Sequence, residues 1–299
     1  MAIPKPDKEL VRDQLQTLQA AHMSWGTECF LAALIWILAR TEEKFGDMAS
    51  VLVPFRFNRI QSDLFPKLER NNLFVKPRQV GGTTFFTLVR LFLPVILDMG
   101  VGSLLISQSN DYVEKHFRII QRAYRMIGAV NPYGSDEENI FSISLKQNLL
   151  HTEASNKREL IFDQLESRIM VASAEVEESA QGVTLHHIVA SEYSRWPGRP
   201  ADTLSNVRGA LVVGGTTDKE CTANGAGGDF FQDCMRALDD DSKSDAKIHF
   251  YPHWWDSDYE LELTEAQKDE LQKDLTSDEL KLIARIHNDL KEVAWVKAT

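Results

Sequence analysis

Short apolar runs alternate with amphipathic helical segments along most of this chain, and no other feature constrains its fold as strongly. Each run is brief enough for a single strand, and polar or glycine-containing segments bound it. Such alternation is typical of a mostly parallel sheet with helices on both faces. We expect strands at 73–76, 103–107, 169–172, 187–191, 217–221 and 248–251. The sequence therefore predicts an α/β core.

Both ends of the chain are predicted to be helical. Near the start, Leu10, Leu15 and Leu18 recur at helical spacing, and a second, strongly apolar helix is expected at 25–40. Near the end, capping boxes begin at Thr264 and Thr276. We therefore expect an N-terminal helical appendage at 1–50, a core at 51–260 and a C-terminal helical lid or linker at 261–299.

A further helix is predicted inside the core, at 111–127, with Asn110 as its N-cap. Its apolar residues share one face, which we expect to pack on the sheet. They are Val113, Phe117, Ile120, Tyr124 and Ile127.

The composition of the chain argues against several classes of protein. The longest apolar stretch, at 30–39, has about half of the roughly 20 residues that a membrane span needs, so neither a span nor a secretory signal is predicted. Three scattered cysteines are too few for a disulfide framework or a zinc site, and they fit a reducing cytosol. A net charge of −11 argues against nonspecific coating of nucleic acid, so any DNA contact must be local.

One segment combines a strand, a glycine-containing loop and a helix. After the apolar run at 73–75 come Lys76, a loop that includes Gly81 and Gly82, and an apolar helix that starts near residue 85. Glycines let backbone N–H groups curl around phosphate oxygens, and the positive end of the following helix points at them. The segment therefore predicts a phosphate-binding loop, in which Thr83 would offer its hydroxyl to Mg²⁺.

The cation of this loop is displaced from its usual place. A standard phosphate-binding loop has a lysine immediately before the metal-binding hydroxyl, and Gly82 stands there. Lys76 and Arg78 lie upstream, and we expect Lys76 to reach back to the β- and γ-phosphates, with Arg78 as the substitute. The segment alone is equally compatible with an ordinary Gly-Gly turn flanked by solvated basic residues.

A second polar site is predicted where the strand at 187–191 ends. Ser191 could bind Mg²⁺ or its water, and Glu192 could align and deprotonate an attacking water molecule. Ser191 replaces the aspartate that is usual in such a Walker B motif. Taken alone, the segment could also be a strand that runs into a charged turn, and its place after the glycine loop favours the functional interpretation.

Three motifs in this order resemble those of the ATPase domain of phage terminase large subunits. They are Lys-x-Arg-Gln-x-Gly-x-Thr-Thr at 76–84, Ser-Glu-x-x-x-Trp at 191–196 and the glycine-rich segment at 220–231. The resemblance extends from about residue 48 to residue 295. It implies a RecA-like P-loop NTPase fold of the ASCE class, with a mostly parallel central sheet flanked by helices, that binds ATP and Mg²⁺.

The resemblance implies a role for each residue of the loop and of the strand ends. ATP would be bound by Gln61, Lys76, Arg78, Gln79, Val80, Gly81, Gly82, Thr83 and Thr84. Thr83 and Ser191 would hold the Mg²⁺ ion. Glu192 would be catalytic, and Arg78 would stabilise the charge of the transition state.

Two further roles follow from the resemblance. Gln61 would hydrogen-bond the adenine edge, beside an aromatic ring that could equally belong to the core. Thr222 would sense the γ-phosphate and couple hydrolysis to DNA movement, with Thr216 and Thr217 as nearby rivals. The segment at 220–231 could alternatively be a plain glycine-rich loop before a helix at Asp229.

The chain departs from the family pattern at one more position. Gln181 stands where family members often have an arginine that acts across a subunit interface. Arg122, Arg125 and Arg158 are candidates to act in its place, and each is equally compatible with plain surface charge. Full-length members also carry a nuclease domain, and we expect no nuclease activity here, because the acidic run at 239–241 resembles the solvated end of a helix.

The function implied by the resemblance is an ATPase motor that moves double-stranded DNA into a viral procapsid. It would act as a homo-oligomeric ring in the host cytoplasm, transiently at the procapsid portal, with the portal protein and the terminase small subunit as partners and without a membrane. Two alternatives stay open. The chain could be a non-catalytic nucleotide-binding structural subunit, because the usual lysine and aspartate are absent, or another RecA-like nucleic-acid motor such as a helicase.

Overall fold

The computed structural model of the protein describes residues 8–41, 49–131, 134–152, 158–175, 182–239, 241–256 and 263–286. Within these ranges the centre is a seven-stranded sheet in the order β5-β6-β4-β7-β8-β3-β9. The strands are β3 (Asn71–Lys76), β4 (Gly102–Ser107), β5 (Glu159–Phe162), β6 (Ser167–Ser173), β7 (Leu185–Ser191), β8 (Leu211–Thr222) and β9 (Ala246–Phe250). Only β5, at one edge, pairs antiparallel with its neighbour in this sheet. The predicted α/β core is confirmed.

Each strand expected from the sequence overlaps a strand of this sheet. β4 shows why these strands could be predicted from the sequence. All of its residues are buried, with Leu104 and Ile106 in the core on one face of the sheet and Leu105 in the core on the other. A strand covered on both faces leaves an unbroken apolar run. Edge strand β5 has no counterpart among the predictions, because it is short and its residues alternate between half-buried and buried.

The order of the strands defines the class of the fold. β8 follows β3 and β7 in the sequence, but it lies between them in the sheet. A strand inserted between the loop-bearing strand and the strand that ends in an acidic turn is the arrangement of RecA-like, ASCE-class proteins, so the predicted fold class is confirmed. Because β3, β7 and β8 are parallel, their carboxyl ends meet at the same edge of the sheet.

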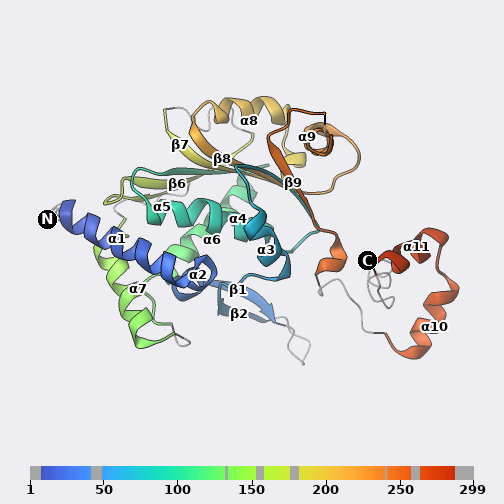
Figure 1. Cartoon of the computed structure of the whole chain (residues 1–299), viewed down its shortest axis with the longest axis horizontal. Coiled ribbons are helices and arrows are strands. Elements are labelled where there is room, and N and C mark those ends of the chain that lie inside the picture. The colour runs from blue at the N-terminus through green and yellow to red at the C-terminus, as the bar shows by residue number, and fades with distance from the viewer. Residues whose placement is uncertain are drawn as a thin grey trace.

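Helices cover both faces of the sheet (Figure 1). On one face lie α8 (Pro200–Arg208) and α9 (Gly228–Leu238). On the other face lie α6 (Asn110–Met126) and a continuous helix made of α4 (Gly82–Phe86), a π-helical segment (Thr87–Phe92) and α5 (Leu93–Leu97). The helix expected at 111–127 is confirmed, although it starts one residue earlier and Ser109 occupies the N-cap position predicted for Asn110.

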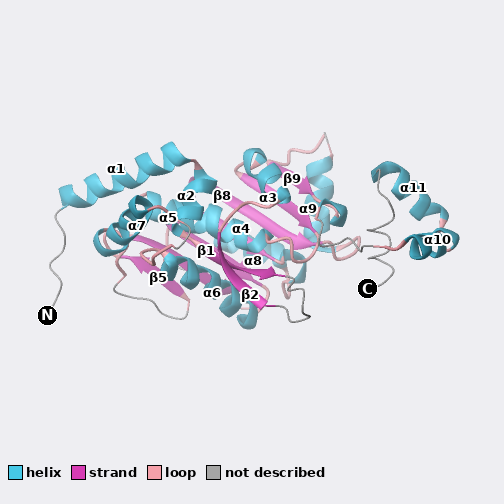
Figure 2. Ribbon diagram, turned by 90° about the horizontal axis from the view of Figure 1, so that it is seen from below, coloured by secondary structure: helices cyan, strands magenta, loops and turns pink. Residues whose placement is uncertain are grey.

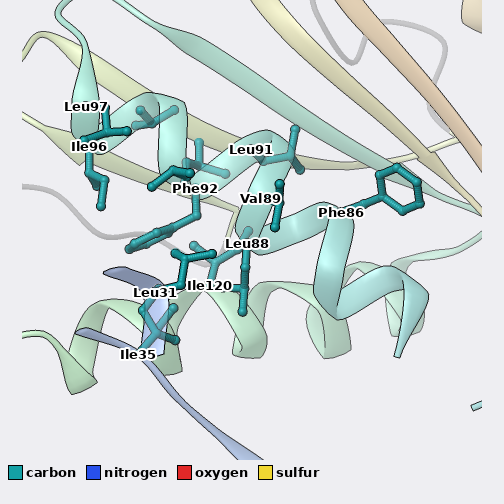
Figure 3. Close-up of a cluster of buried hydrophobic side chains, with 14 of the residues drawn as sticks. Leu31, Ile35, Phe86, Leu88, Val89, Leu91, Phe92, Ile96, Leu97 and Ile120 are labelled. Carbon is teal, nitrogen blue, oxygen red and sulfur yellow. The ribbon is translucent and has the colours of Figure 1, made fainter. Parts of the chain in front are cut away.

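The helix that follows the glycine loop is widened in its middle. Pro94 has no N–H, and in a regular helix its ring would collide with the carbonyl four residues earlier. The chain forms π turns instead, in which the N–H of Leu93 bonds to the Leu88 carbonyl. Figure 3 shows Leu88 within the buried cluster that also includes Ile120 of α6 and Ile35. This packing anchors the helix whose first turn carries the candidate site.

The N-terminal region is only partly helical. α1 (Lys8–Trp25) and α2 (Thr27–Leu34) are helices, whereas β1 (Trp36–Thr41) and β2 (Ala49–Pro54) form an antiparallel two-stranded sheet. The helix expected at 25–40 is therefore wrong in its second half. A short apolar run does not distinguish a buried helix from a strand, and the pairing of 36–41 with 49–54 decides for the strand. The expected domain boundary at residue 50 falls inside β2.

Other helical elements lie before β3, beside the N-terminal helices and at the C-terminal end of the described residues. α3 (Arg59–Leu64) and a single turn (Phe65–Lys67) precede β3, and α7 (Asp136–Asn148) packs against α1 and α2. α10 (Glu265–Lys273) and α11 (Ser277–Ile286) start with the predicted capping boxes and lie beside the main body, away from the sheet (Figures 1 and 2). Within the described ranges, no helix is both long and apolar enough to cross a membrane.

Candidate functional site

Three parallel strands end side by side at the edge of the sheet where the predicted site residues lie. β3 ends at Lys76, β7 at Ser191 and β8 at Thr222. Across the sheet, Ser191 is paired with Glu220, and Lys76 with Thr222. The glycine loop leaves β3 at this edge, and the acidic turn leaves β7. The fold thus brings together the three segments whose motifs stand far apart in the sequence.

The glycine loop is held in place by the first turn of α3. Asn58 Nδ2 donates to the Val80 carbonyl at 3.0 Å, and Gln61 Nε2 donates to the Gly81 carbonyl at 3.1 Å. Gln61 Oε1 also accepts the Asn58 N–H in a capping box, and the Gln61 side chain is only 4% exposed. In this structure the Gln61 amide therefore positions the loop. Its expected contact with an adenine stays a prediction.

Gly82 leaves open the space that the Lys76 side chain occupies. Lys76 is 7% exposed, and its aliphatic stem lies against the start of α4. A Cβ at position 82 would lie 2.8 Å from Lys76 Cδ, 3.1 Å from Lys76 Cε and 2.7 Å from a ring carbon of Phe74. A lysine at the standard position is therefore incompatible with this path of Lys76. Glycine at 82 and lysine at 76 are complementary parts of one packing arrangement.

The ammonium group of Lys76 lies between two carboxylates. Its Nζ is 3.4 Å from Glu192 Oε1 and 3.5 Å from Glu220 Oε2. Burial lowers the pKa of Lys76, but the charges of Glu220 and Glu192 raise it, and the net shift is upward from the ordinary value. The ammonium group is therefore charged at neutral pH, as the binding of a phosphate requires.

The sequence motifs do not assign Glu220 a role, yet the structure places it at the centre of the site. Its side chain is fully buried, and its Oε1 accepts hydrogen bonds from Thr83 Oγ1 at 2.5 Å and from Ser191 Oγ at 2.7 Å. One feature of the sequence could have identified it, which is a glutamate within a predicted strand. Burial of an unpaired carboxylate inside a covered parallel sheet costs free energy, so such a residue is expected to have partners. The predicted residues Thr83 and Ser191 are thus brought together by an unpredicted one.

Glu192 starts the turn after β7 in a strained backbone conformation. Its φ of 50° lies in the left-handed region, which costs a residue other than glycine about 1–3 kcal/mol. Glu192 Oε2 contacts Arg195 Nε at 3.4 Å and Cys221 Sγ at 3.7 Å. Trp196 Nε1 donates to the Ser191 carbonyl at 2.9 Å and closes the turn. In this conformation the other oxygen of Glu192, Oε1, lies 3.4 Å from the Lys76 ammonium group.

The oxygen atoms at the centre of the site suit a hard divalent cation. Mg²⁺ prefers oxygen ligands and is usually held by one or two carboxylates together with water and substrate phosphates. Thr83 and Ser191 offer hydroxyls beside one Glu220 oxygen, and the other Glu220 oxygen has no hydrogen-bond partner in the described parts of the chain. No group of three or more His, Cys, Asp or Glu side chains in those parts is arranged to hold a metal. These residues therefore fit a Mg²⁺ ion that is also bound by phosphates.

Other predicted residues lie around this centre. Arg78 and Gln79 are exposed in the loop, and Gln79 has a φ of 64°. Thr84 is half-buried in the first turn of α4, and Thr222 is half-buried at the end of β8. Their proposed contacts with ATP and with the coupling machinery stay predictions.

The candidates for an arginine that acts across a subunit interface lie on or beside α6. Arg122 and Arg125 belong to this helix, and Arg158, just before β5, donates a hydrogen bond to the first residue of α6 at 2.7 Å. Gln181 lies outside the described residues, as does the middle residue of the acidic run at 239–241. The roles expected for these positions stay predictions.

Comparisons with known proteins concern the fold. No protein-family model matches the chain, and no curated protein does. Solved structures that are similar to it include the HK97 bacteriophage large terminase, with 16% identity and a TM-score of 0.49 over 67% of this chain and 41% of that one. The large terminase of a thermophilic bacteriophage has 13% identity and a TM-score of 0.49 over 75% and 51%. The ATPase domain of a Thermus phage large terminase has 15% identity and a TM-score of 0.46 over 65% and 80%.

These solved structures come from the protein family that the sequence motifs resemble. The chain spans about half or less of the length of the two whole terminases. Because every identity is low, these similarities concern the fold alone.

Proposed function

We propose that this chain binds and hydrolyses ATP at the ends of β3, β7 and β8. The proposal depends on one observation. The Lys76 side chain occupies the space that Gly82 leaves open, so the strand before the loop supplies the loop's lysine. An ordinary Gly-Gly turn with solvated basic residues gives no reason for a buried lysine beside it. The same ammonium group contacts Glu192, a carboxylate for a water molecule, and Glu220, which accepts a hydrogen bond from Thr83, a hydroxyl for a metal.

Each residue has a separate task in the proposed reaction. The backbone N–H groups of the loop and the Lys76 ammonium group bind the β- and γ-phosphates and offset the charge that moves onto the leaving oxygen. Thr83 and Ser191 help to hold Mg²⁺, which when bound polarises the phosphates. Glu192 orients the attacking water molecule and accepts its proton. Arg78, exposed in the loop, is the candidate for additional positive charge in the transition state.

The contacts of Glu192 indicate how substrate would activate it. In this structure Lys76 pairs with Glu192 Oε1, and Arg195 pairs with Oε2. The phosphates of ATP carry more negative charge than a carboxylate, so they compete for Lys76. Once Lys76 turns to the phosphates, one Glu192 oxygen is available to the water molecule while Arg195 keeps the carboxylate oriented. The base thus becomes available when the substrate arrives.

We further propose that hydrolysis drives the packaging of double-stranded DNA into a viral procapsid. The support is the resemblance of the three motifs, in order, to those of phage terminase large subunits. Thr222, which pairs with Lys76 across the sheet, would transmit the state of the nucleotide to elements that grip DNA. The motor would be a ring of several copies in the host cytoplasm, and it would act at the portal protein together with the terminase small subunit.

The test of the catalytic assignment is the variant Glu192→Gln. We expect it to bind nucleotide like the wild type and to release phosphate at least about 100-fold more slowly, because a positioned base contributes about that factor or more. Thr83→Ala should instead weaken the binding of nucleotide with Mg²⁺. The matched control is Glu114→Gln, whose carboxylate is 61% exposed on α6 and should not affect either measurement. Unchanged turnover in Glu192→Gln would remove the assignment.

A non-catalytic nucleotide-binding subunit is the second candidate function. It is favoured by Ser191, which stands where a Walker B aspartate is usual. This function predicts that the purified wild-type chain binds nucleotide but releases no phosphate, with or without DNA. A helicase would differ from both by separating strands without a portal.

A further inference from the structure

Glu220 is a buried carboxylate to which the reaction described above gives no task. It lies on β8, with Ser191 of β7 on one side and β3 on the other, and its side chain is 0% exposed. An ionised carboxylate is strongly destabilising in such a place unless a cation and hydrogen-bond donors accompany it. In this structure the cation is Lys76, at 3.5 Å, and the donors are two hydroxyls.

The arrival of phosphates would upset this balance of charge. The positive charge of Lys76 lies between the negative charges of Glu192 and Glu220. Arg195 contacts the other oxygen of Glu192, Oε2. When the phosphates draw Lys76 toward them, Glu220 loses part of the one ion pair that it forms with the described residues, and it gains new negative neighbours. Repulsion between like charges in contact is large inside a protein. A second cation beside Glu220 removes this conflict.

The hydroxyls around Glu220 point to the nature of that cation. Thr83 Oγ1 and Ser191 Oγ both donate to the same Glu220 oxygen, at 2.5 Å and 2.7 Å. Side-chain oxygen atoms from α4, β7 and β8, each of a type that binds metal ions, therefore converge on one place. Glu220 Oε2 accepts no hydrogen bond from the described residues and faces the Lys76 ammonium group at 3.5 Å, so this oxygen becomes available to a cation when Lys76 turns to the phosphates. Oxygen donors of this kind suit Mg²⁺ or Mn²⁺.

We propose that Glu220 is the carboxylate that holds the divalent cation of the bound nucleotide. In a Walker B motif that carboxylate stands at the end of the strand equivalent to β7, where this chain has Ser191. Glu220 is the residue directly paired with Ser191 across the sheet, so the charge has moved by one strand. The assignment rests on the proposed function, because the cation arrives with the nucleotide.

The rival role for Glu220 is to hold Lys76 in place. The two roles differ in how the loss of the charge affects nucleotide binding. If Glu220 only positions Lys76, its removal changes nucleotide affinity equally with and without a metal. If Glu220 binds the metal, its removal leaves the affinity without metal unchanged or higher, and it weakens only the binding that depends on the metal.

The experiment measures the binding of a fluorescent, non-hydrolysable ATP analogue to the full chain, in MgCl₂ and in excess EDTA. We expect the wild type to bind the analogue at least about tenfold more tightly with Mg²⁺ than with EDTA, and Glu220→Gln to lose most of this advantage of Mg²⁺. Loss of a group that supports a metal ligand typically lowers metal affinity by about 10–100-fold, and loss of the ligand itself should lower it at least as much. The double variant Ser191→Asp/Glu220→Gln returns the carboxylate to β7 and should regain the advantage. Electron paramagnetic resonance of added Mn²⁺ should show more bound metal in the wild type and the double variant than in Glu220→Gln.

The outcomes separate this assignment from the proposed function. If Glu220→Gln keeps the wild-type advantage of Mg²⁺, or loses affinity equally in both buffers, the role of Glu220 is overturned while nucleotide binding stands. If the wild type binds the analogue in neither buffer, the proposed function is overturned and this assignment with it. Glu220→Asp, which keeps the charge but shortens its reach, should retain part of the advantage and guards against a folding defect of the glutamine variant. Glu114→Gln is the control.

Discussion

Replacement of Lys76 by methionine should destabilise the protein, and the loss should depend on Glu220. The two groups are 3.5 Å apart, with side chains that are 6% and 0% exposed. At an effective dielectric constant of about 20, their attraction is about 5 kcal/mol, and the removal of one partner from a buried pair costs about 3–5 kcal/mol. Methionine fills the space of the lysine stem, so the cost arises mainly from the carboxylate left without its cation.

A double-mutant cycle isolates this interaction. Glu220→Gln alone should cost about 1 kcal/mol, because Lys76 keeps Glu192 at 3.4 Å and an amide oxygen can still accept the two hydroxyl hydrogen bonds. Lys76→Met alone should cost about 3–5 kcal/mol. The double variant should be little worse than Glu220→Gln, which gives a coupling energy of several kcal/mol. Urea unfolding without nucleotide, followed by circular dichroism, measures each free energy of unfolding.

The control cycle uses the exposed pair Arg118 and Glu114, which are 4.0 Å apart with side chains 70% and 61% exposed. We expect a coupling of at most about 0.5 kcal/mol there, because solvent screens the charges. If the costs of Lys76→Met and Glu220→Gln simply add to within about 0.5 kcal/mol, the two residues do not form an energetically coupled pair. The electrostatic picture of the site would then be refuted.

Packing and protonation near this site lead to two more expectations. Gly82→Ala should cost about 1–3 kcal/mol and weaken nucleotide binding, because its Cβ would meet Lys76 and Phe74, whereas Gly227→Ala, with nothing within 4 Å, should leave nucleotide binding unchanged in the same titration. Burial lowers the pKa of His116 from 6.5 to about 4, so its contribution to stability is complete above pH 6.5 and is lost as the pH falls toward 4, by up to about 3 kcal/mol. In urea unfolding, the free energy of unfolding of His116→Phe should fall less over this pH range than that of the wild type. An equal fall in both proteins would show that the lowered pKa of His116 does not cause it.

Local sequence patterns predicted much of the core because its strands are covered on both faces. β4 contains the unbroken apolar run 104–106 and β7 the run 188–190, and the turn from β3 into α4 carries its own glycines. The same patterns failed where pairing decides between alternatives. The segment at 36–41 is apolar enough for a helix, and it becomes a strand because 49–54 pairs with it. β5 lies at an edge of the sheet, is only four residues long, and alternates between half-buried and buried residues.

The site shows the same division. Lys76, Thr83, Ser191 and Glu192 were predicted as site residues from strand ends, from glycine spacing and from the order of the motifs. The structure brings these four side chains together around the Lys76 ammonium group and the Glu220 carboxylate. Glu220 was not predicted. Its role depends on the insertion of β8 between β3 and β7, which no local pattern indicates.

The sequence by itself determined the alternation of strands and helices, the glycine loop and the acidic turn, because each depends on residues that are close together in the chain. Tertiary structure alone decided the order of the strands, the path of the Lys76 side chain across Gly82, and the position of Glu220 next to Ser191 and Lys76. Lys76 and Glu192 lie 116 residues apart in the chain, and their atoms are 3.4 Å apart in the fold. Such a distance is set by the packing of whole strands and helices, which local spacing does not record.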